Sequence, residues 1–135
     1  LSALGAFDLR TDDPEESPIA PTPRLPRRQI WMKANGVVSA NPALQRCLLA
    51  YVSDFTFMTT SLMPHGKAVL SPGLQAASID HAMWFHRPFA IDEWLLHTVE
   101  SPTAQGARGL ARGRIFSRDG RLVTTTAQEG LIRMR

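Results

Sequence analysis

The amino-acid sequence predicts an α+β domain in which one long helix packs against a mostly antiparallel β-sheet. The clearest helical spacing of apolar residues lies in residues 42–55, and β-compatible runs follow one another from residue 75 onwards. The last two runs are joined by Asp119-Gly120, a pair that tolerates positive φ and favours a tight hairpin. The expected order of elements is β–α–β–β–β–β, without an internal repeat.

Residues 1–26 differ in composition from the rest of the chain. They carry five acidic residues and five prolines: Asp8, Asp12, Asp13, Glu15 and Glu16, then Pro14, Pro18, Pro21, Pro23 and Pro26. Proline lacks a backbone N–H and disfavours helix in the residue before it, so this stretch is expected to be irregular or extended. We interpret residues 1–26 as a proline-rich acidic linker and residues 27–135 as the folded domain.

The first strand and the helix follow this linker. Residues 28–34 form a β-compatible run that ends at Asn35-Gly36. Asn41 is placed to cap the helix, and Pro42 suits the first helical position, where a backbone N–H is not needed. A helix from Pro42 to about Phe55 would present an apolar face to the core, made by Leu44, Leu48, Tyr51, Val52 and Phe55.

Four strands are expected after Pro72-Gly73, at residues 75–85, 93–100, 107–117 and 121–134. In the third of them small and apolar residues alternate with larger ones. The small face consists of Gly109, Ala111, Gly113 and Ile115. Such a face is expected where another backbone approaches the strand closely.

Composition and charge exclude several classes of protein. The 135 residues suit one domain, and a net charge of +3, spread along the chain, fits an anionic small ligand at least as well as a polymer. The densest basic cluster, Arg24, Arg27 and Arg28, is too short for a nucleic-acid tail. No apolar run approaches the roughly 18 residues that span a membrane. We therefore expect neither a nucleic acid nor a membrane as partner.

Cys47 is the single cysteine, so no disulfide can form within the chain. This is expected of a reducing compartment, and we predict a cytoplasmic protein. Because Cys47 lies among apolar residues of the predicted helix, we expect an unreactive thiol in the core. The chain begins with Leu1 rather than Met, which is expected of a fragment or a processed product.

Four histidines raise the question of a metal site. His81 and His86 are five residues apart in a predicted strand, so their side chains should point to opposite faces. His65 lies in a predicted loop and His97 in another strand, a distribution that does not favour zinc. The sequence also lacks a glycine-rich phosphate-binding loop and a Gly-x-Ser-x-Gly nucleophile motif. We therefore expect no metal and no bound cofactor.

Three polar residues stand in apolar surroundings: Asp54 at the predicted helix end, Ser78 in a strand, and Gln128 in the last strand. A carboxylate buried at the first of these positions would need hydrogen bonds and could act as a base or orient a water. Taken singly, each residue is equally compatible with an exposed position or with hydrogen bonds beside the strand ladder. Asp80 is a second candidate carboxylate, or an anchor for the adjacent turn.

Several segments resemble the second domain of the acyl-CoA thioesterase II family. They are RQIWMKANG at 28–36, AYVSDF at 50–55, IDHAMWFHRPF at 79–89 and AQEG at 127–130, with VESP at 99–102 and ARG at 107–109 between them. The resemblance runs in order from about residue 27 to the C-terminus. It implies a hotdog fold, in which a curved antiparallel sheet wraps around one long central helix, and this agrees with the order of elements predicted above.

The resemblance also implies a partner and an activity. Members of the family carry two hotdog domains in one chain, so the expected partner is an N-terminal hotdog domain or a second copy in a homo-oligomer. The implied reaction is hydrolysis of acyl-CoA thioesters by an activated water, with no covalent intermediate and no cofactor. The residues that activate this water in the family match Asp54 as base, with Ser78 and Gln128 as orienting donors.

An acyl-CoA substrate needs cations for its phosphates and an apolar tunnel for its acyl chain. Arg87 and Arg108 are the candidate cations, with Arg112 and Arg114 also available. The candidate tunnel residues are Phe55, Phe57, Met58 and Met83. Solvated surface arginine and ordinary core packing are the simpler interpretations of these two sets.

Two other functions stay open on the sequence. An enoyl-CoA hydratase or dehydratase needs a histidine paired with an acid, for which His81 beside Asp80 is the local candidate. A non-catalytic acyl-CoA-binding hotdog domain needs no base, so replacing Asp54 would leave its behaviour unchanged.

Overall fold

A single antiparallel sheet curls around a helix in this protein. The computed structural model describes residues 4–11, 13, 21–55 and 57–135. Its strands are β1 (Phe7–Thr11), β2 (Arg27–Ala34), β3 (Leu74–Ser78), β4 (Ala82–Phe85), β5 (Leu95–Gln105), β6 (Arg108–Ser117) and β7 (Leu122–Met134). The helices are α1 (Pro42–Ser53) and two 3₁₀ segments, η1 (Leu4–Ala6) and η2 (Met58–His65). The α+β architecture predicted from the sequence is confirmed, and in the described residues one α-helix lies between β2 and β3. β1 was not expected, and one predicted strand is divided into β3 and β4.

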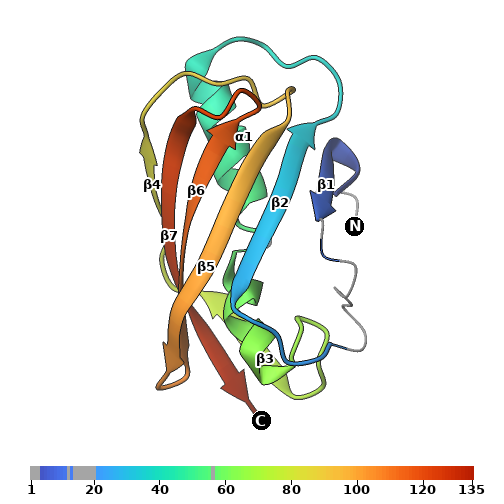
Figure 1. The fold of residues 1–135 in the computed structure, drawn as a ribbon, viewed down its shortest axis with the longest axis vertical. Helices are drawn as coiled ribbons and strands as arrows, with labels where there is room; N and C mark the ends of the chain where they lie inside the picture. The colour runs from blue at the N-terminus through green and yellow to red at the C-terminus, as the bar shows by residue number, and fades with distance from the viewer. Residues whose placement is uncertain (1–3, 12, 14–20, 56) are drawn as a thin grey trace.

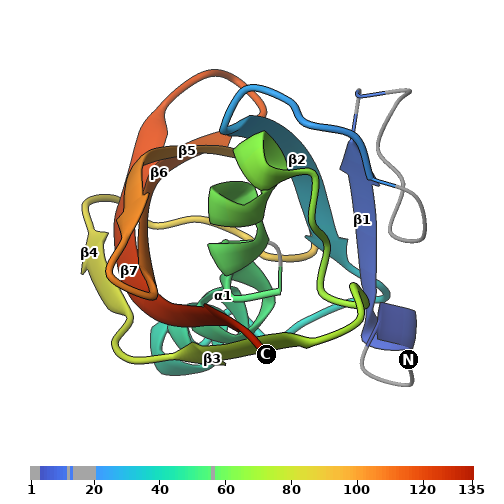
Figure 2. The same cartoon turned by 90° about the horizontal axis from the view of Figure 1, so that it is seen from below.

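The strands are hydrogen-bonded in the order β1-β2-β5-β6-β7-β3, and β4 also pairs with β7. Figure 1 shows the long strands β2, β5, β6 and β7 side by side, and Figure 2 shows the sheet curled around α1 and η2. Apolar residues of α1, including Leu49 and Val52, share one core cluster with Met32 and Ile115 of the sheet. None of the helices in the described part of the chain is long and apolar enough to cross a membrane.

The helix begins as the sequence predicts. Oδ1 of Asn41 accepts hydrogen bonds from the backbone N–H groups of Ala43 and Leu44, and Pro42 occupies the first turn. An N-cap of this kind satisfies N–H groups that have no partner within the helix. The helix ends at Ser53, two residues before the predicted end, and Asp54 is its C-cap.

The predicted apolar face of the helix is confirmed only in part: Val52 is buried, and Leu48 and Phe55 pack against the core. Gln45, Leu49, Val52 and Ser53 are buried, whereas Leu44 and Tyr51 are 42% and 49% exposed. Cys47, expected in the core, is also exposed. The helix carries apolar residues on more than one side, so spacing could not select the side that meets the sheet. Burial of Gln45 was unexpected, but Oε1 of this residue accepts a hydrogen bond from the N–H of Ile91 at 2.7 Å.

Strand β1 lies within the predicted linker of residues 1–26. It pairs with β2 from Phe7 opposite Ala34 to Thr11 opposite Ile30, and the Phe7 side chain is buried in the core. The sheet therefore includes residues before the predicted boundary at residue 27. The prolines that suggested a linker all follow this strand, so their effect on the backbone does not reach it. Residues 1–3, 12 and 14–20 of the predicted linker lie outside the described residues.

The strand predicted at residues 75–85 is two strands separated by a bulge. Ser78 pairs with Gly130 and Ala82 pairs with Ala127, so the three residues 79–81 stand opposite the two residues 128–129. The backbone N–H groups of Ile79 and Asp80 both donate to the carbonyl of Glu129, at 2.9 and 3.3 Å. One extra residue in a strand reverses the side to which the following side chains point.

Segment η2 lies against the small face of β6 and β7, as expected from the alternation in residues 107–117. A Cβ atom placed on Gly109 would lie 2.7 Å from the side chain of Ser61, and one on Gly130 would lie 2.1 Å from Sδ of Met58. Glycine at these positions lets η2 approach the sheet. The hairpin between β6 and β7 is also confirmed, with Gly120 at φ 88°.

Candidate active site

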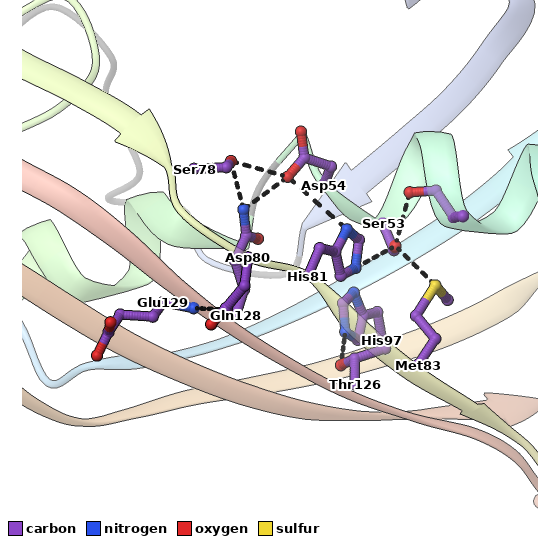
Figure 3. Close-up of polar contacts among 11 residues, drawn as sticks. Ser53, Asp54, Ser78, Asp80, His81, Met83, His97, Thr126, Gln128 and Glu129 are labelled. Carbon is purple, nitrogen blue, oxygen red and sulfur yellow. Dashed lines mark hydrogen bonds and ion pairs between the residues drawn. The ribbon is translucent and has the colours of Figure 1, made fainter.

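Three side chains from distant parts of the chain meet at the end of α1. Nε2 of Gln128 donates hydrogen bonds to Oδ1 of Asp54 at 2.8 Å and to Oγ of Ser78 at 2.5 Å. The Ser78 hydroxyl in turn faces Oδ1 of Asp54 at 3.4 Å. Figure 3 shows these three contacts as a closed triangle. The structure thus brings together the three residues that the resemblance singled out.

Each of the three is placed by its secondary structure. Asp54 is the C-cap of α1, so its side chain leaves the helix where the last turn meets the sheet. Ser78 is the last residue of β3, and Gln128 lies in β7 on the face that is turned toward the helix, two residues before Gly130, the partner of Ser78. Gln128 is 1% exposed, whereas the Asp54 side chain is 46% exposed. The site is therefore rigid on the sheet side and open to solvent at the carboxylate.

The amide of Gln128 has only one orientation that fits its neighbours. A carboxylate oxygen accepts hydrogen bonds, so the NH₂ end of the amide must face Asp54. The carbonyl oxygen, Oε1, is then buried and has no hydrogen-bond partner among the described residues. All contacts to Asp54 reach Oδ1, and within the described part of the chain nothing lies within hydrogen-bond distance of Oδ2. One carboxylate oxygen is thus held, and the other can accept a hydrogen bond from a water.

A pair of histidines lies beside this triangle. Nδ1 of His81 is 4.0 Å from Oδ1 of Asp54, and Nε2 of the same ring is 3.4 Å from Oγ of Ser53. The ring of Phe57 stacks on both His81 and His97, with centroid distances of 5.9 and 5.3 Å. Nε2 of His97 hydrogen-bonds Oγ1 of Thr126 at 3.0 Å. Figure 3 shows the two imidazoles next to one another, between the helix end and the sheet.

His97 is fully buried, and this changes its protonation. Burial, reinforced by the nearby charge of His81, lowers the pKa of His97 from 6.5 to about 3. Nδ1 of His97 has no hydrogen-bond partner among the described residues, so nothing there would stabilise a second ring proton. His97 is therefore neutral at physiological pH and adds no charge to the site.

The arginines predicted to bind coenzyme A lie away from this site. Nη1 of Arg87 donates to the carbonyl of Leu122, and Arg108 forms an ion pair with Glu129 at 3.4 Å. Arg112 pairs with Glu100 at 2.7 Å, and the Arg114 guanidinium lies over the ring of Phe116. In β6 the arginines alternate with the buried residues of the inner face, so they point outward, to the side opposite Gln128.

The four predicted tunnel residues do not line one common cavity. Phe57 is fully buried in a core cluster with Ile30 and Val99, so it packs the interior. Met83 packs against the core beneath α1, and Met58 contacts the sheet at Gly130. Phe55 lines a cavity of about 660 Å³ between β1, β2 and η2, together with Leu9, Met63 and Leu70. Of the four, Phe55 is thus the residue with open space beside it.

The contact between His81 and Asp54 was missed by the sequence analysis. An uninterrupted strand over residues 75–85 would turn Ser78 inward and His81, three residues later, outward. The extra residue of the bulge turns His81 inward as well. Asp80, the acid proposed for a hydratase pair, instead accepts a hydrogen bond from the backbone N–H of Glu129 at 2.8 Å. The described residues contain no group of three histidine, cysteine, aspartate or glutamate side chains that could hold a metal ion.

Comparisons with known proteins identify the family of the chain. The family profile described as acyl-CoA thioesterase matches residues 18–131. The chain is 53% identical over 111 residues to acyl-CoA thioesterase 2 of Haemophilus influenzae, an alignment that covers 82% of this chain and 39% of that protein. It is 40% identical over 121 residues to human acyl-coenzyme A thioesterase 8, covering 88% of this chain and 37% of that protein.

Solved structures give the same result. Acyl-CoA thioesterase II TesB2 from Mycobacterium marinum superposes with a TM-score of 0.85 and 36% identity, over 99% of this chain and 51% of that one. A protein with a hot dog fold from Alicyclobacillus acidocaldarius, 17% identical, matches with a TM-score of 0.73 over 97% of this chain and 47% of that one, which concerns the fold alone. The chain spans about two fifths to half of the length of these relatives. It has a hotdog fold and belongs to the acyl-CoA thioesterase family.

Proposed function

We propose that the protein hydrolyses acyl-CoA thioesters to a free fatty acid and coenzyme A, with Asp54 as the general base. The observation that carries this proposal is the arrangement around Asp54. Oδ1 is held by Gln128 and faces Ser78, while Oδ2 has no hydrogen-bond partner among the described residues and the side chain is half exposed. A carboxylate fixed in this way can accept the proton of a water without having to reorient.

In the proposed reaction the water oxygen attacks the thioester carbonyl carbon while its proton passes to Oδ2 of Asp54. The tetrahedral intermediate then collapses, the C–S bond breaks, and the sulfur leaves with the proton that Asp54 had taken up. No covalent enzyme intermediate and no cofactor are needed. General-base assistance typically contributes about 10²- to 10⁴-fold in rate. Gln128 and Ser78 contribute by fixing the direction of the carboxylate.

We also propose that the site is completed by a second hotdog domain, either an upstream domain of the same protein or a second copy of this chain. Residues 27–135 would form the catalytic half, and residues 1–26 would connect it to the first half while adding β1 to the sheet. The exposure of the Asp54 side chain supports this, because a base of this kind works best where water is excluded. The cations for the coenzyme A phosphates would then come partly from the partner, since Arg87 donates to the carbonyl of Leu122 and Arg108 lies on the outer face of β6. We further propose that the protein is located in the cytoplasm, because Cys47 is a free thiol and free thiols are typical of reducing compartments.

Release of free thiol separates this function from its two alternatives. The full-length protein should release coenzyme A from saturated acyl-CoA substrates, measured with a thiol reagent across a series of acyl lengths. A hydratase would instead hydrate crotonyl-CoA without releasing thiol, and the hydrogen bond from Glu129 to Asp80 argues against it, because it occupies the acid that such an enzyme would pair with His81. A binding domain would retain acyl-CoA and turn over neither substrate.

A further inference from the structure

His81 faces the carboxylate of Asp54 but has no part in the reaction proposed above. Its Nδ1 lies 4.0 Å from Oδ1 of Asp54, within ion-pair range, and its side chain is 21% exposed. Gln128 and Ser78 reach the same oxygen from the sheet side. Figure 3 shows Oδ1 of Asp54 as the point where all three approaches end. The Nδ1 edge of the imidazole thus faces the same carboxylate oxygen as Gln128 and Ser78, at a distance somewhat longer than a hydrogen bond.

The orientation of the His81 ring is fixed independently of Asp54. Nε2 faces the hydroxyl of Ser53 at 3.4 Å, and the ring stacks on Phe57 with an interplanar angle of 25°. The Ser53 hydroxyl lies within reach of both the carbonyl of Ala50, at 3.1 Å, and Nε2 of His81, so when the ring carries its proton on Nδ1 the hydroxyl can donate to Nε2. A ring held on one edge and one face can point its other nitrogen, Nδ1, at only one place.

The order Ser53–His81–Asp54 has the atoms of a serine-hydrolase triad, with Nε2 toward serine and Nδ1 toward aspartate. Ser53 cannot act as the nucleophile, however, because it is fully buried and a substrate cannot reach its hydroxyl. Its hydroxyl therefore helps to fix the orientation of the His81 ring. His97, whose ring also stacks on Phe57, stays neutral, with a pKa of about 3, and does not compete for the carboxylate.

We propose that His81 is a positioning residue for Asp54: it directs Nδ1–H at Oδ1 from ion-pair distance and so keeps Oδ2 turned toward the attacking water. The bulge at residues 79–81 brings the imidazole to the inner face, beside Ser78 and Gln128. The inference rests on the proposed hydrolase function and adds a fourth residue to its site. His81 acts through Asp54 and touches neither the water nor the thioester.

Two substitutions of His81 separate its two nitrogens. The amide nitrogen of asparagine takes a position close to that of Nδ1, and the amide nitrogen of glutamine takes one close to that of Nε2. His81→Asn therefore keeps a donor toward Asp54 and loses the nitrogen that faces Ser53, while His81→Gln keeps a nitrogen near Ser53 and loses the donor toward Asp54. Steady-state hydrolysis by the full-length protein should show that His81→Asn retains most of kcat. His81→Gln and His81→Leu should lower kcat about tenfold to a hundredfold, with KM unchanged.

The stability of each variant is measured by urea unfolding, so that a change in kcat can be distinguished from a loss of stability. A structural role for His81 would make kcat follow the loss of stability, with the shorter asparagine at least as harmful as glutamine. Equal kcat in the Asn and Gln variants, or recovery with Gln instead of Asn, would overturn the positioning role. Asp54→Asn is measured alongside. If it turns over acyl-CoA like the wild type, the hydrolase proposal itself has failed, whatever the His81 variants do.

A double-mutant cycle with Ser53→Ala gives a second readout, in which the effect of Ser53→Ala on kcat is compared with and without the imidazole. Removing the Ser53 hydroxyl should loosen the ring and lower kcat while His81 is present. In the His81→Asn background, where Nε2 no longer exists, Ser53→Ala should have no further effect on kcat. Additive effects of the two substitutions on kcat would show that Ser53 and His81 do not act as a unit.

Discussion

Nε2 of Gln128 and Oδ1 of Asp54 lie 2.8 Å apart although 74 residues separate them in the chain. One belongs to the last strand and the other to the end of the helix, so the contact forms only when the sheet has curled around α1. The hydrogen bond joins a buried amide to a carboxylate, a charge-assisted pair that is stronger than a bond between neutral groups. Folding of the domain and assembly of the site are therefore the same event.

Replacement of Asp54 by asparagine should abolish most of the activity while the fold survives. Asparagine keeps an oxygen that can accept from Gln128, but it cannot take a proton from water. We expect kcat for acyl-CoA hydrolysis to fall by about 10²- to 10⁴-fold, measured as free thiol. Asp80→Asn is the matched control, because its amide oxygen can still accept from the N–H of Glu129, and its kcat should stay near wild type. Unaltered turnover in Asp54→Asn would remove this residue from the mechanism.

Replacement of Gln128 by alanine should lower kcat without removing the base. Asp54 would then lose the donor at 2.8 Å that holds Oδ1, and its carboxylate could rotate. Loss of one positioned donor typically costs on the order of 10²- to 10³-fold. Gln75→Ala, which removes the exposed partner of Arg133 on β3, is the control and should hydrolyse normally. If both glutamine variants were equally active, the amide of Gln128 would have no part in catalysis.

His97 should make the protein sensitive to acid. Its pKa is about 3 when folded and 6.5 as a free side chain, so between these pH values the unfolded chain binds the additional proton. The contribution to stability is complete above pH 6.5 and is lost as the pH falls toward 3, by about 1.4 kcal/mol per pH unit. Urea midpoints measured from pH 7 to pH 4 should decrease less in His97→Gln than in wild type. His65→Gln, at an exposed position, should keep the wild-type slope, and an unchanged slope in His97→Gln would contradict the assignment.

A side chain at Gly113 should destabilise the sheet. A Cβ atom there would lie 2.6 Å from Nε2 of His97, 2.8 Å from Oγ1 of Thr126 and 2.9 Å from the backbone oxygen of Thr98. The backbone cannot move aside cheaply, so Gly113→Ala should lose about 1–3 kcal/mol in the free energy of unfolding. Gly5→Ala provides the comparison, since a Cβ atom at Gly5 meets nothing within 4 Å. A Gly113→Ala variant as stable as Gly5→Ala would show that the strand can shift to accept the methyl group.

The 135-residue chain should self-associate when studied alone. Leu44 and Tyr51 are exposed on α1, and Trp84 is 52% exposed on β4, whose short strand pairs with β7 at one edge of the sheet. Exposed apolar groups beside an unpaired strand edge favour contact with another domain. Sedimentation velocity should give a dimer, and Tyr51→Asp should shift it toward monomer. A monodisperse monomer at micromolar concentration would argue against a partner domain that covers these residues of α1 and β4.

The order of elements could be predicted because it depends on local chemistry. Asn41 and Pro42 determine where the helix begins, and Gly120 supplies the positive φ that the hairpin needs. The alternation in residues 107–117 predicted a close approach, which η2 makes. The triangle of Asp54, Ser78 and Gln128 was predicted from the resemblance alone, since no single one of these residues is distinctive in the sequence.

Other features followed from contacts between distant residues. β1 joins the sheet by pairing with the edge of β2. In α1, Leu49 and Val52 are buried against the sheet, whereas Leu44 and Tyr51 remain exposed although they are also large and largely apolar. The bulge depends on how residues 79–81 match residues 128–129 on another strand.

The sequence by itself thus determined which segments become helix and strand, and the family to which they belong. Only the tertiary structure decided which faces are buried, and that His81 meets Asp54. The direction of a side chain depends on strand register and on the surface opposite, and neither is a property of the segment that carries it.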